Sequence, residues 1–302
     1  MSQPFKPGLL ACLLVPPLLW ASNAIVGKLA AGLIAPVTLN TLRWTVAWLV
    51  LAPFVATAMR RHAATLRAQA LPLAVSAFWG ITAYNALQYL ALTLSSPIST
   101  SLIGASAPVL VLLIGRLGYG AKIGPMGALG ALVSIAGVIW VMVEGDAAKL
   151  RGLAFSAGDL VMLAATLAWS VYTWRLRTER SGLPAGVLLG AQILAGVLLS
   201  LPLVALEQAY GGYGPIRWDG RTLAIVAYVG VMPSLVAIFC WRHAVSRTSA
   251  QLPVFFMNLT PIFTVLLSAA MLRQYPQAHH YAGLALILAG IVLAQRDTAS
   301  GR

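Results

Sequence analysis

Long apolar segments separated by short polar connections make up most of the chain. Apolar runs of about 18 residues or more are typical of transmembrane helices, and the stretch from Ile123 to Val143 contains no charged residue. Because the connections are short, no soluble domain is inserted. The pattern predicts an all-α integral membrane protein with ten spans, at residues 9–31, 37–58, 71–92, 97–117, 123–143, 156–176, 185–206, 221–241, 250–272 and 278–295.

The second half of the chain repeats the first, which indicates two five-helix copies at residues 1–146 and 147–302. An odd number of spans per copy places the second copy upside down in the membrane. Inverted repeats are a transporter architecture, with the substrate site near the midplane. Four positions recur at one offset: Ala91, Pro108, Gly130 and Gly137 return as Ala244, Pro261, Gly283 and Gly290.

Composition and charge agree with a membrane protein. The chain is 60% hydrophobic and 9% charged, whereas soluble domains are about one quarter charged. Lys6 before an apolar run could open a signal peptide, but nine further spans favour a first membrane helix. With the N-terminus inside, cytoplasmic segments carry 13 Lys and Arg and outer segments 6, so both termini should be cytoplasmic. The net charge of +13 therefore reflects topology and not nucleic-acid binding.

Sequence signals of enzymatic chemistry are missing. The chain contains no Gly-rich phosphate loop, no H-E-x-x-H and no G-x-S-x-G. His62 and His243 fall on the predicted inner side and His279 and His280 on the outer side, so they cannot converge on one metal. We expect no enzyme, no metal and no cofactor. Cys12 and Cys240 both lie within spans, which makes a disulfide framework implausible.

All seven acidic residues lie in predicted loops or at span ends. A proton-driven exporter of cations normally holds a carboxylate within the membrane, where it is costly and therefore functional. We accordingly expect passive or gradient-following transport and do not favour cationic drugs as substrates.

Neutral polar and aromatic side chains recur at helical spacing on the first, third, sixth and ninth spans. Buried amides in hydrocarbon need partners, so these faces should turn inward. Interhelical hydrogen bonding is the alternative for any single residue, whereas the set favours a shared cavity suited to a zwitterion with an apolar or aromatic side chain. The candidate substrate-binding residues are Trp20, Asn23, Tyr84, Asn85, Gln88, Trp169, Tyr172, Gln251, Phe255 and Asn258.

The roles of two cations and of several glycines have alternative interpretations. Arg43 is about 10 Å deep in its span; it is either functional or a partner of helix ends or of Asp159. Lys28 should extend to the interface. Glycine pairs on the fifth, seventh and tenth spans indicate close helix packing, within one chain or between protomers.

The chain resembles the drug/metabolite transporter superfamily with EamA-type domains. The resemblance rests on Trp20-Ala-Ser-Asn23 and Ala168-Trp169-Ser170 at the start of each copy, and on the repeated Ala, Pro and Gly positions. It implies a basket of helices around a central cavity. The most similar branch comprises bacterial exporters of aromatic amino acids. The membrane-embedded glutamate of small multidrug exporters has no counterpart near Trp20 to Asn23. The lysine usual near the ends of late helices in sugar-nucleotide and phosphate antiporters is missing from the tenth span, so the resemblance does not favour these substrate classes.

The sequence and the resemblance together predict a bacterial inner-membrane exporter of small neutral metabolites. Amino acids, including aromatic ones, are the favoured substrates, moved by alternating access between the inverted repeats. The alternatives are a multidrug or other metabolite exporter on the same fold and, in a different class, an intramembrane enzyme or lipid-handling scaffold. Expected partners are the substrate and membrane lipids, without nucleic acid, and a monomer is compatible with the sequence.

Overall fold

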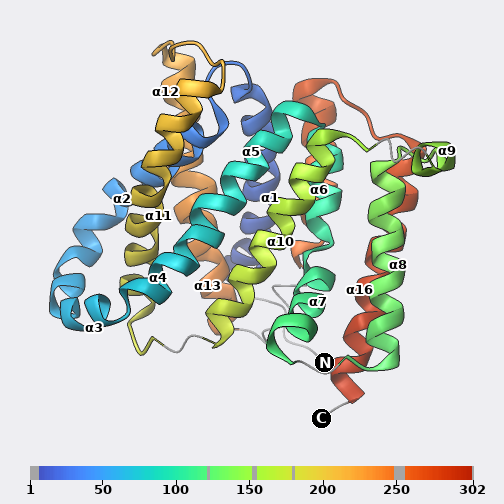
Figure 1. The fold of residues 1–302 in the computed structure, drawn as a ribbon, viewed down its shortest axis with the longest axis horizontal. Helices are drawn as coiled ribbons and strands as arrows, with labels where there is room; N and C mark the ends of the chain where they lie inside the picture. Colours follow the sequence, from blue (N-terminus) through green and yellow to red (C-terminus); the bar gives the residue numbers. More distant parts are fainter. Residues whose placement is uncertain (1–6, 121–122, 152–154, 179–180, 248–255, 301–302) are drawn as a thin grey trace.

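The computed structural model describes residues 7–120, 123–151, 155–178, 181–247 and 256–300, and every regular element in these ranges is a helix (Figure 1). The α-helices are α1 (Pro7–Ala30), α2 (Pro36–Arg61), α3 (Ala63–Ala68), α4 (Ala70–Ala77), α5 (Tyr84–Leu94), α6 (Pro97–Ala105), α7 (Ala107–Tyr119), α8 (Pro125–Met142), α9 (Ala147–Arg151), α10 (Ala157–Thr178), α11 (Ala185–Tyr210), α12 (Gly220–Val231), α13 (Ala237–Arg247), α15 (Leu259–Leu267) and α16 (Ala278–Ser300). Three π-helical segments join some of them: η1 (Phe78–Ala83), η2 (Met232–Val236) and η3 (Ser268–Leu272).

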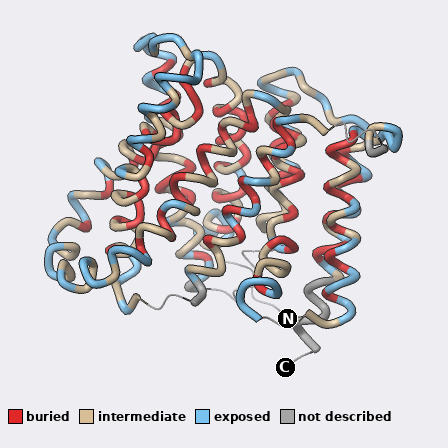
Figure 2. The backbone as a smooth tube through the Cα atoms, in the orientation of Figure 1, coloured by how far each residue is buried: buried red, intermediate tan, exposed pale blue. Residues whose placement is uncertain are grey.

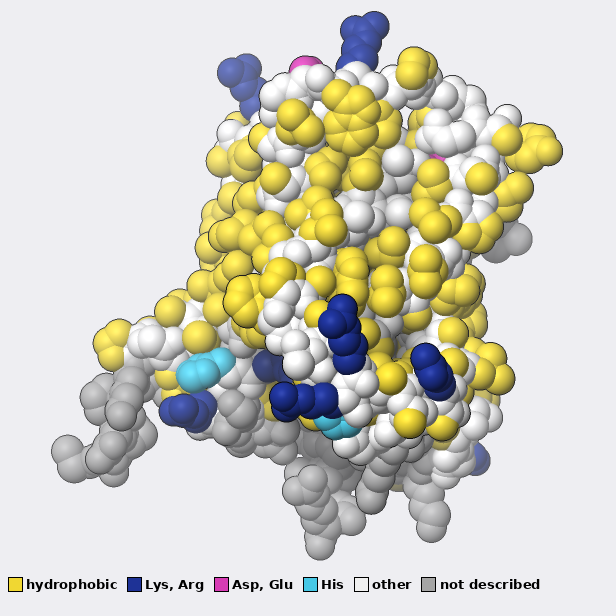
Figure 3. All heavy atoms as spheres, turned by 90° about the vertical axis from the view of Figure 1, so that its left-hand side faces the viewer, with side chains coloured by type: hydrophobic (Ala, Val, Ile, Leu, Met, Phe, Trp, Pro, Cys, Tyr) yellow, Lys and Arg dark blue, Asp and Glu magenta, His cyan; other side chains and the backbone are white. Residues whose placement is uncertain are grey.

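Length and apolar composition identify six helical stretches in the described ranges that can cross a membrane. The pair α6 and α7, bent by 43° at Ser106, would be a seventh. Figure 3 shows hydrophobic side chains over the middle of one face and most Lys and Arg towards its two ends, as expected for a bilayer-spanning surface. The six stretches are Pro7–Ala30, Pro36–Arg61, Ala70–Leu94, Pro125–Met142, Ala185–Tyr210 and Gly220–Val245.

The helices α8 and α16 lie side by side at one edge of the bundle and meet through glycines (Figure 1). A Cβ on Gly290 would lie 2.5 Å from the Gly130 oxygen and 2.5 Å from the Ser134 nitrogen. A Cβ on Gly137 would lie 2.9 Å from the Gly283 oxygen. The prediction that these glycines serve packing is confirmed, and the contact is within one chain.

The remaining long helices pack around a common interior. α2 packs on α11, α5 on α10, and α1 on α13 and α15. Gly190 of α11 accommodates Val55 and Trp48 of α2, so the predicted glycine pair on this helix is also a packing feature. Buried residues follow the facing sides of the helices and exposed residues their outer sides (Figure 2).

An acidic side chain at the end of α11 fixes the beginning of α2. The Glu207 carboxylate accepts hydrogen bonds from the Val37 and Thr38 backbone nitrogens and from Thr38 Oγ1, each at 2.8 Å. A carboxylate at a helix N-terminus satisfies free N–H groups and complements the helix dipole. α2, which carries Arg43, is thereby held at a defined height against α11.

We expect Gly290→Ala to destabilise the protein. The new methyl group would press on the backbone of α8, and overpacking of this kind costs about 1–3 kcal/mol. Thermal unfolding in detergent, followed by tryptophan fluorescence, should show a lower midpoint than for Gly118→Ala, whose Cβ meets nothing within 4 Å. Equal midpoints for the two variants would contradict a tight contact between α8 and α16.

Candidate substrate-binding site

Two apolar helices change from α-helical to π-helical geometry near their middles. η1 separates α4 from α5, and η2 separates α12 from α13. Side chains donate hydrogen bonds to backbone carbonyls at these breaks. Asn40 Nδ2 donates to Ile81 O at 3.0 Å, and Ser234 Oγ donates to Val229 O at 2.7 Å. Such breaks are tolerated at membrane depth where neighbouring groups re-satisfy the backbone, and π-segments are frequent at functional sites.

A buried arginine lies between the two breaks. Arg43 of α2 is only 3% exposed. Its Nε donates to Ser234 Oγ at 2.6 Å, and its Nη1 donates to Asn85 Oδ1 at 2.7 Å and to Tyr89 OH at 3.5 Å. The Tyr89 hydroxyl in turn donates to Asn23 Oδ1 at 2.8 Å. Arg43 therefore connects α2 with α1, α5 and η2 through neutral partners.

Aromatic rings from α5 and α10 form a second cluster. The ring centroids of Tyr84 and Trp169 are 4.9 Å apart, and those of Trp169 and Tyr172 are 5.4 Å apart. Gln88 lies beside them, with Nε2 at 3.5 Å from Tyr84 OH. Trp169 keeps 36% of its surface exposed, whereas Tyr172 keeps 9%. The cluster therefore offers an accessible aromatic surface next to an amide.

The arginine network and the aromatic cluster meet at Gly80 in η1. Asn85 Nδ2 donates to Gly80 O at 2.9 Å, and a Cβ on Gly80 would lie 2.6 Å from the Tyr172 ring. Tyr84 and Asn85 are neighbours in the chain, and one turns to the rings while the other turns to Arg43. A cationic group and an aromatic surface thus lie on two faces of one helix.

Six of the ten candidate residues predicted from the sequence fall into two groups, and the other four lie apart from them or outside the described residues. Asn23 and Asn85 join the arginine network, and Tyr84, Gln88, Trp169 and Tyr172 form the aromatic cluster. Trp20 lies against Trp241 of α13, with centroids 5.9 Å apart, and its Nε1 donates to Pro233 O at 3.1 Å. Asn258 is half-buried at the start of α15. Gln251 and Phe255 lie outside the described residues.

Tyr89, Ser234 and Trp241 were not predicted as part of the site. Tyr89 is four residues after Asn85 and so shares its helix face, which is a signal the sequence contains. Ser234 lies 150 positions after Tyr84, the offset that also relates Gly80 to Gly230. Its link to Arg43 depends on the fold of two distant segments, and the sequence gives no direct sign of it.

The structure shows the partners of two charged groups. Arg43 does not pair with Asp159, because its partners are Ser234, Asn85 and Tyr89. Asp159, in the first turn of α10, is only 3% exposed and accepts a hydrogen bond from Ser95 Oγ at 2.6 Å. This carboxylate lies at a span end, as expected, and passive or gradient-following transport stays a prediction.

Lys28 caps the C-terminal end of α5. Its Nζ donates to Leu92 O at 2.8 Å and to Ser95 O at 2.9 Å, which compensates carbonyls left free at the end of that helix. Ser95 thus bonds Lys28 through its carbonyl and Asp159 through its hydroxyl. These contacts tie the ends of α1 and α5 to the start of α10.

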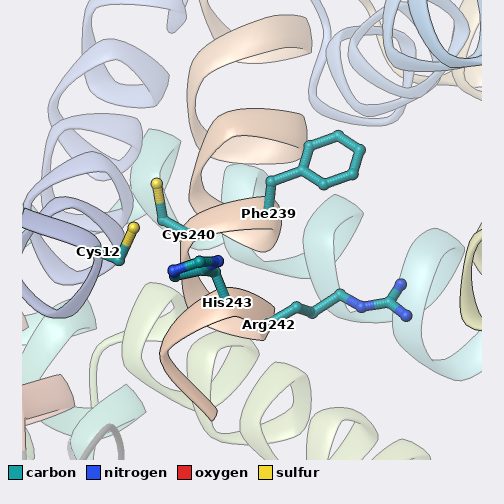
Figure 4. A pocket seen from close by; sticks show the side chains of 5 residues that line it. All are labelled: Cys12, Phe239, Cys240, Arg242 and His243. Carbon is teal, nitrogen blue, oxygen red and sulfur yellow. The ribbon is translucent and has the colours of Figure 1, made fainter. Parts of the chain in front are cut away.

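A cavity of about 580 Å³ opens near the beginning of α1, away from Arg43. Figure 4 shows the side chains that line it, with Cys12 of α1 facing Cys240 of α13 and with Phe239, Arg242 and His243 nearby. No group of three His, Cys, Asp or Glu side chains that could hold a metal ion occurs within the described ranges. The cavity is thus a candidate entrance.

Ionic contacts outside the spans are local. Glu144, in the connection before α9, pairs with Lys149, and hydrogen bonding from this ammonium holds the pKa of the Glu144 carboxyl below its usual range. Asp219 accepts a bond from the Thr222 backbone nitrogen at 2.7 Å, which caps α12 and lowers the pKa of the Asp219 carboxyl. Neither acid contributes to the buried network.

Long apolar helices with a polar and aromatic centre define a multi-pass membrane transporter and not an enzyme. The chain belongs to the EamA-like transporter family, whose sequence model matches residues 7–143 and 156–295. The substrate of such a transporter is a small molecule.

Named relatives are similar at low identity. The chain is 25% identical over 281 residues to the aromatic amino acid exporter YddG of Ancylobacter novellus, covering 92% of this chain and 93% of that protein. It is 26% identical over 240 residues to a probable terminal-alkyne amino-acid exporter of Streptantibioticus cattleyicolor, covering 78% and 77%. A crystal structure of a protein 24% identical in sequence matches the fold with a TM-score of 0.60, covering 99% of this chain and 100% of that one.

Proposed function

We propose that this transporter exports small neutral amino acids, including aromatic ones, from the bacterial cytoplasm. The observation that carries the proposal is the cluster of Tyr84, Trp169 and Tyr172 beside Gln88 and the Arg43 network. Aromatic faces suit an apolar or aromatic side chain, and amides and hydroxyls suit the polar end of an amino acid. The amino-acid exporters among the relatives support the same substrate class.

The proposed mechanism is alternating access between two inverted five-helix repeats, at residues 1–146 and 147–302, with ten spans in all. The two ranges matched by the family model support this division. Packing supports it as well. With the ten spans numbered in order, the contact of α1 with α13 joins spans one and eight, and the contact of α5 with α10 joins spans three and six. Because span one corresponds to span six and span three to span eight, exchange of the two repeats converts each contact into the other.

The proposed location is the inner membrane, with both termini in the cytoplasm. The support is the distribution of basic residues, 13 on one side and 6 on the other. In this orientation the cavity near Cys12 faces the cytoplasm, from which an exporter takes its substrate.

The inverted arrangement predicts opposite labelling of two equivalent connections. Ala68, in the connection between α2 and α4, and Gly214, between α11 and α12, are both exposed. A single cysteine is introduced at each position in a Cys12→Ser and Cys240→Ser background. The two cysteines should differ in their reactivity with a membrane-impermeant maleimide. We expect labelling at position 214 in intact cells and at position 68 only after permeabilisation. Labelling of both from the same side would exclude inverted repeats.

The aromatic cluster predicts which variants lose transport. In proteoliposomes, uptake of labelled phenylalanine at low concentration should fall about two- to tenfold in Trp169→Ala, because stacking of aromatic groups is worth about 0.5–1.5 kcal/mol. Gln88→Ala should also reduce uptake.

The matched control is Trp218→Ala, since Trp218 is 56% exposed in the connection before α12. This variant should retain wild-type uptake. Equal uptake by Trp169→Ala and Trp218→Ala would remove the cluster from the site, and a wild-type protein that moves no amino acid would refute the proposed substrate class.

A further inference from the structure

Arg43 is a buried cation that has no acidic partner among the residues whose side chains are described. Its side chain is 97% enclosed, as only 3% is exposed, and an unpaired charge is costly at this depth. Five of the seven acids lie among residues whose side chains are described, and each bonds elsewhere. Glu144 pairs with Lys149, Asp146 bonds the Ala148 nitrogen, Asp159 bonds Ser95, Glu207 caps α2, and Asp219 caps α12.

Neutral groups hold the guanidinium and leave part of it unused. Ser234 Oγ accepts from Arg43 Nε and itself donates to Val229 O. Asn85 Oδ1 accepts from Arg43 Nη1, while Asn85 Nδ2 donates to Gly80 O. Nη2 has no hydrogen-bond partner within the described ranges. The group is therefore positioned in advance and retains donors for one further acceptor.

We propose that Arg43 binds the carboxylate of the transported amino acid, an inference that rests on the proposed function. A guanidinium favours a carboxylate because both are planar and their hydrogen bonds are charge-assisted. A single cation suits a monoanion better than a phosphate, which carries a charge of about −1.5 to −2. The ligand class is thus an α-amino or other carboxylic acid with an apolar or aromatic side chain.

The Arg43 network and the aromatic cluster are linked through η1. Gly80 contacts Tyr172 on one side and Asn85 on the other, and Tyr84 and Asn85 are consecutive. Under the proposal, one ligand places its carboxylate on Arg43 and its side chain towards the aromatic cluster, on either side of Gly80. The buried charge is neutralised when the ligand is bound.

Two tryptophans separate this site from the cavity. Ser234 in η2 is six residues before Cys240 in α13, and Cys12 in α1 is eight residues before Trp20, or about 9 and 12 Å at about 1.5 Å per residue. Trp20 is bonded to Pro233, the neighbour of Ser234, and its ring meets that of Trp241, the neighbour of Cys240.

The first test is competition in wild-type proteoliposomes. Counterflow of labelled L-phenylalanine is measured with unlabelled L-phenylalanine, 3-phenylpropionate, L-phenylalaninamide or phenethylamine outside. The two carboxylates should compete at least about tenfold better than the amide and the amine, as expected for loss of one charge-assisted pair. Equal competition by phenylalanine and its amide would overturn the role of Arg43 while leaving amino-acid transport intact. An absence of phenylalanine counterflow would overturn the proposed function itself.

The second test places a carboxylate inside the site. In Asn85→Asp, the new acid would lie where Asn85 Oδ1 now accepts from Arg43 at 2.7 Å, and it would compete with the substrate. We expect KM for phenylalanine to rise about tenfold or more and the preference for carboxylate over amide to shrink. Gln69→Glu adds the same charge in the turn before α4 and should keep wild-type KM and preference.

Arg43→Gln provides an independent variant. It should lose the discrimination between phenylalanine and phenylalaninamide, which a purely structural arginine would not set. Unchanged discrimination in both Asn85→Asp and Arg43→Gln would overturn the proposal.

Discussion

The constraint on which this structure depends is the burial of one positive charge. Arg43 enters the helix bundle from α2, and no described acid approaches it. Hydrocarbon offers no solvent for a guanidinium, so α1, α5 and η2 must each present an oxygen to it, directly or through Tyr89. The π-helical segments η1 and η2 lie next to these contacts. Carbonyls in or just before these segments accept from Asn85 and Ser234, whereas a regular α-helix bonds its carbonyls internally.

Rigid packing at the edge supports this polar centre. The glycines between α8 and α16 bring two backbones into contact, and Glu207 fixes the height of α2 against α11. Small residues and satisfied helix ends provide such a frame in a bilayer, where burial of apolar surface drives little association. The aromatic cluster of α5 and α10 lies next to a polar network whose side chains are already positioned.

Much of this arrangement could be predicted from residue patterns. The apolar runs predict the helices, the repeated glycines predict close packing, and the spacing of Tyr84, Gln88, Trp169 and Tyr172 predicts two faces that meet. The partners of Arg43 could not be predicted, because η1 and η2 shift the helical register and Ser234 is distant in sequence. The position of Asp159 at a span end could be predicted, but its burial against Ser95 could not, because Ser95 is 64 residues away in sequence.

The central claim is that the buried arginine and the aromatic cluster form one site for one amino acid. The most direct measurement is an experimental structure with L-tryptophan bound. The account predicts density with the carboxylate within hydrogen-bond distance of Arg43 and the indole ring against Trp169. Density elsewhere, with the contacts from Arg43 to Ser234 and Asn85 unchanged and its Nη2 still unbonded, would contradict it.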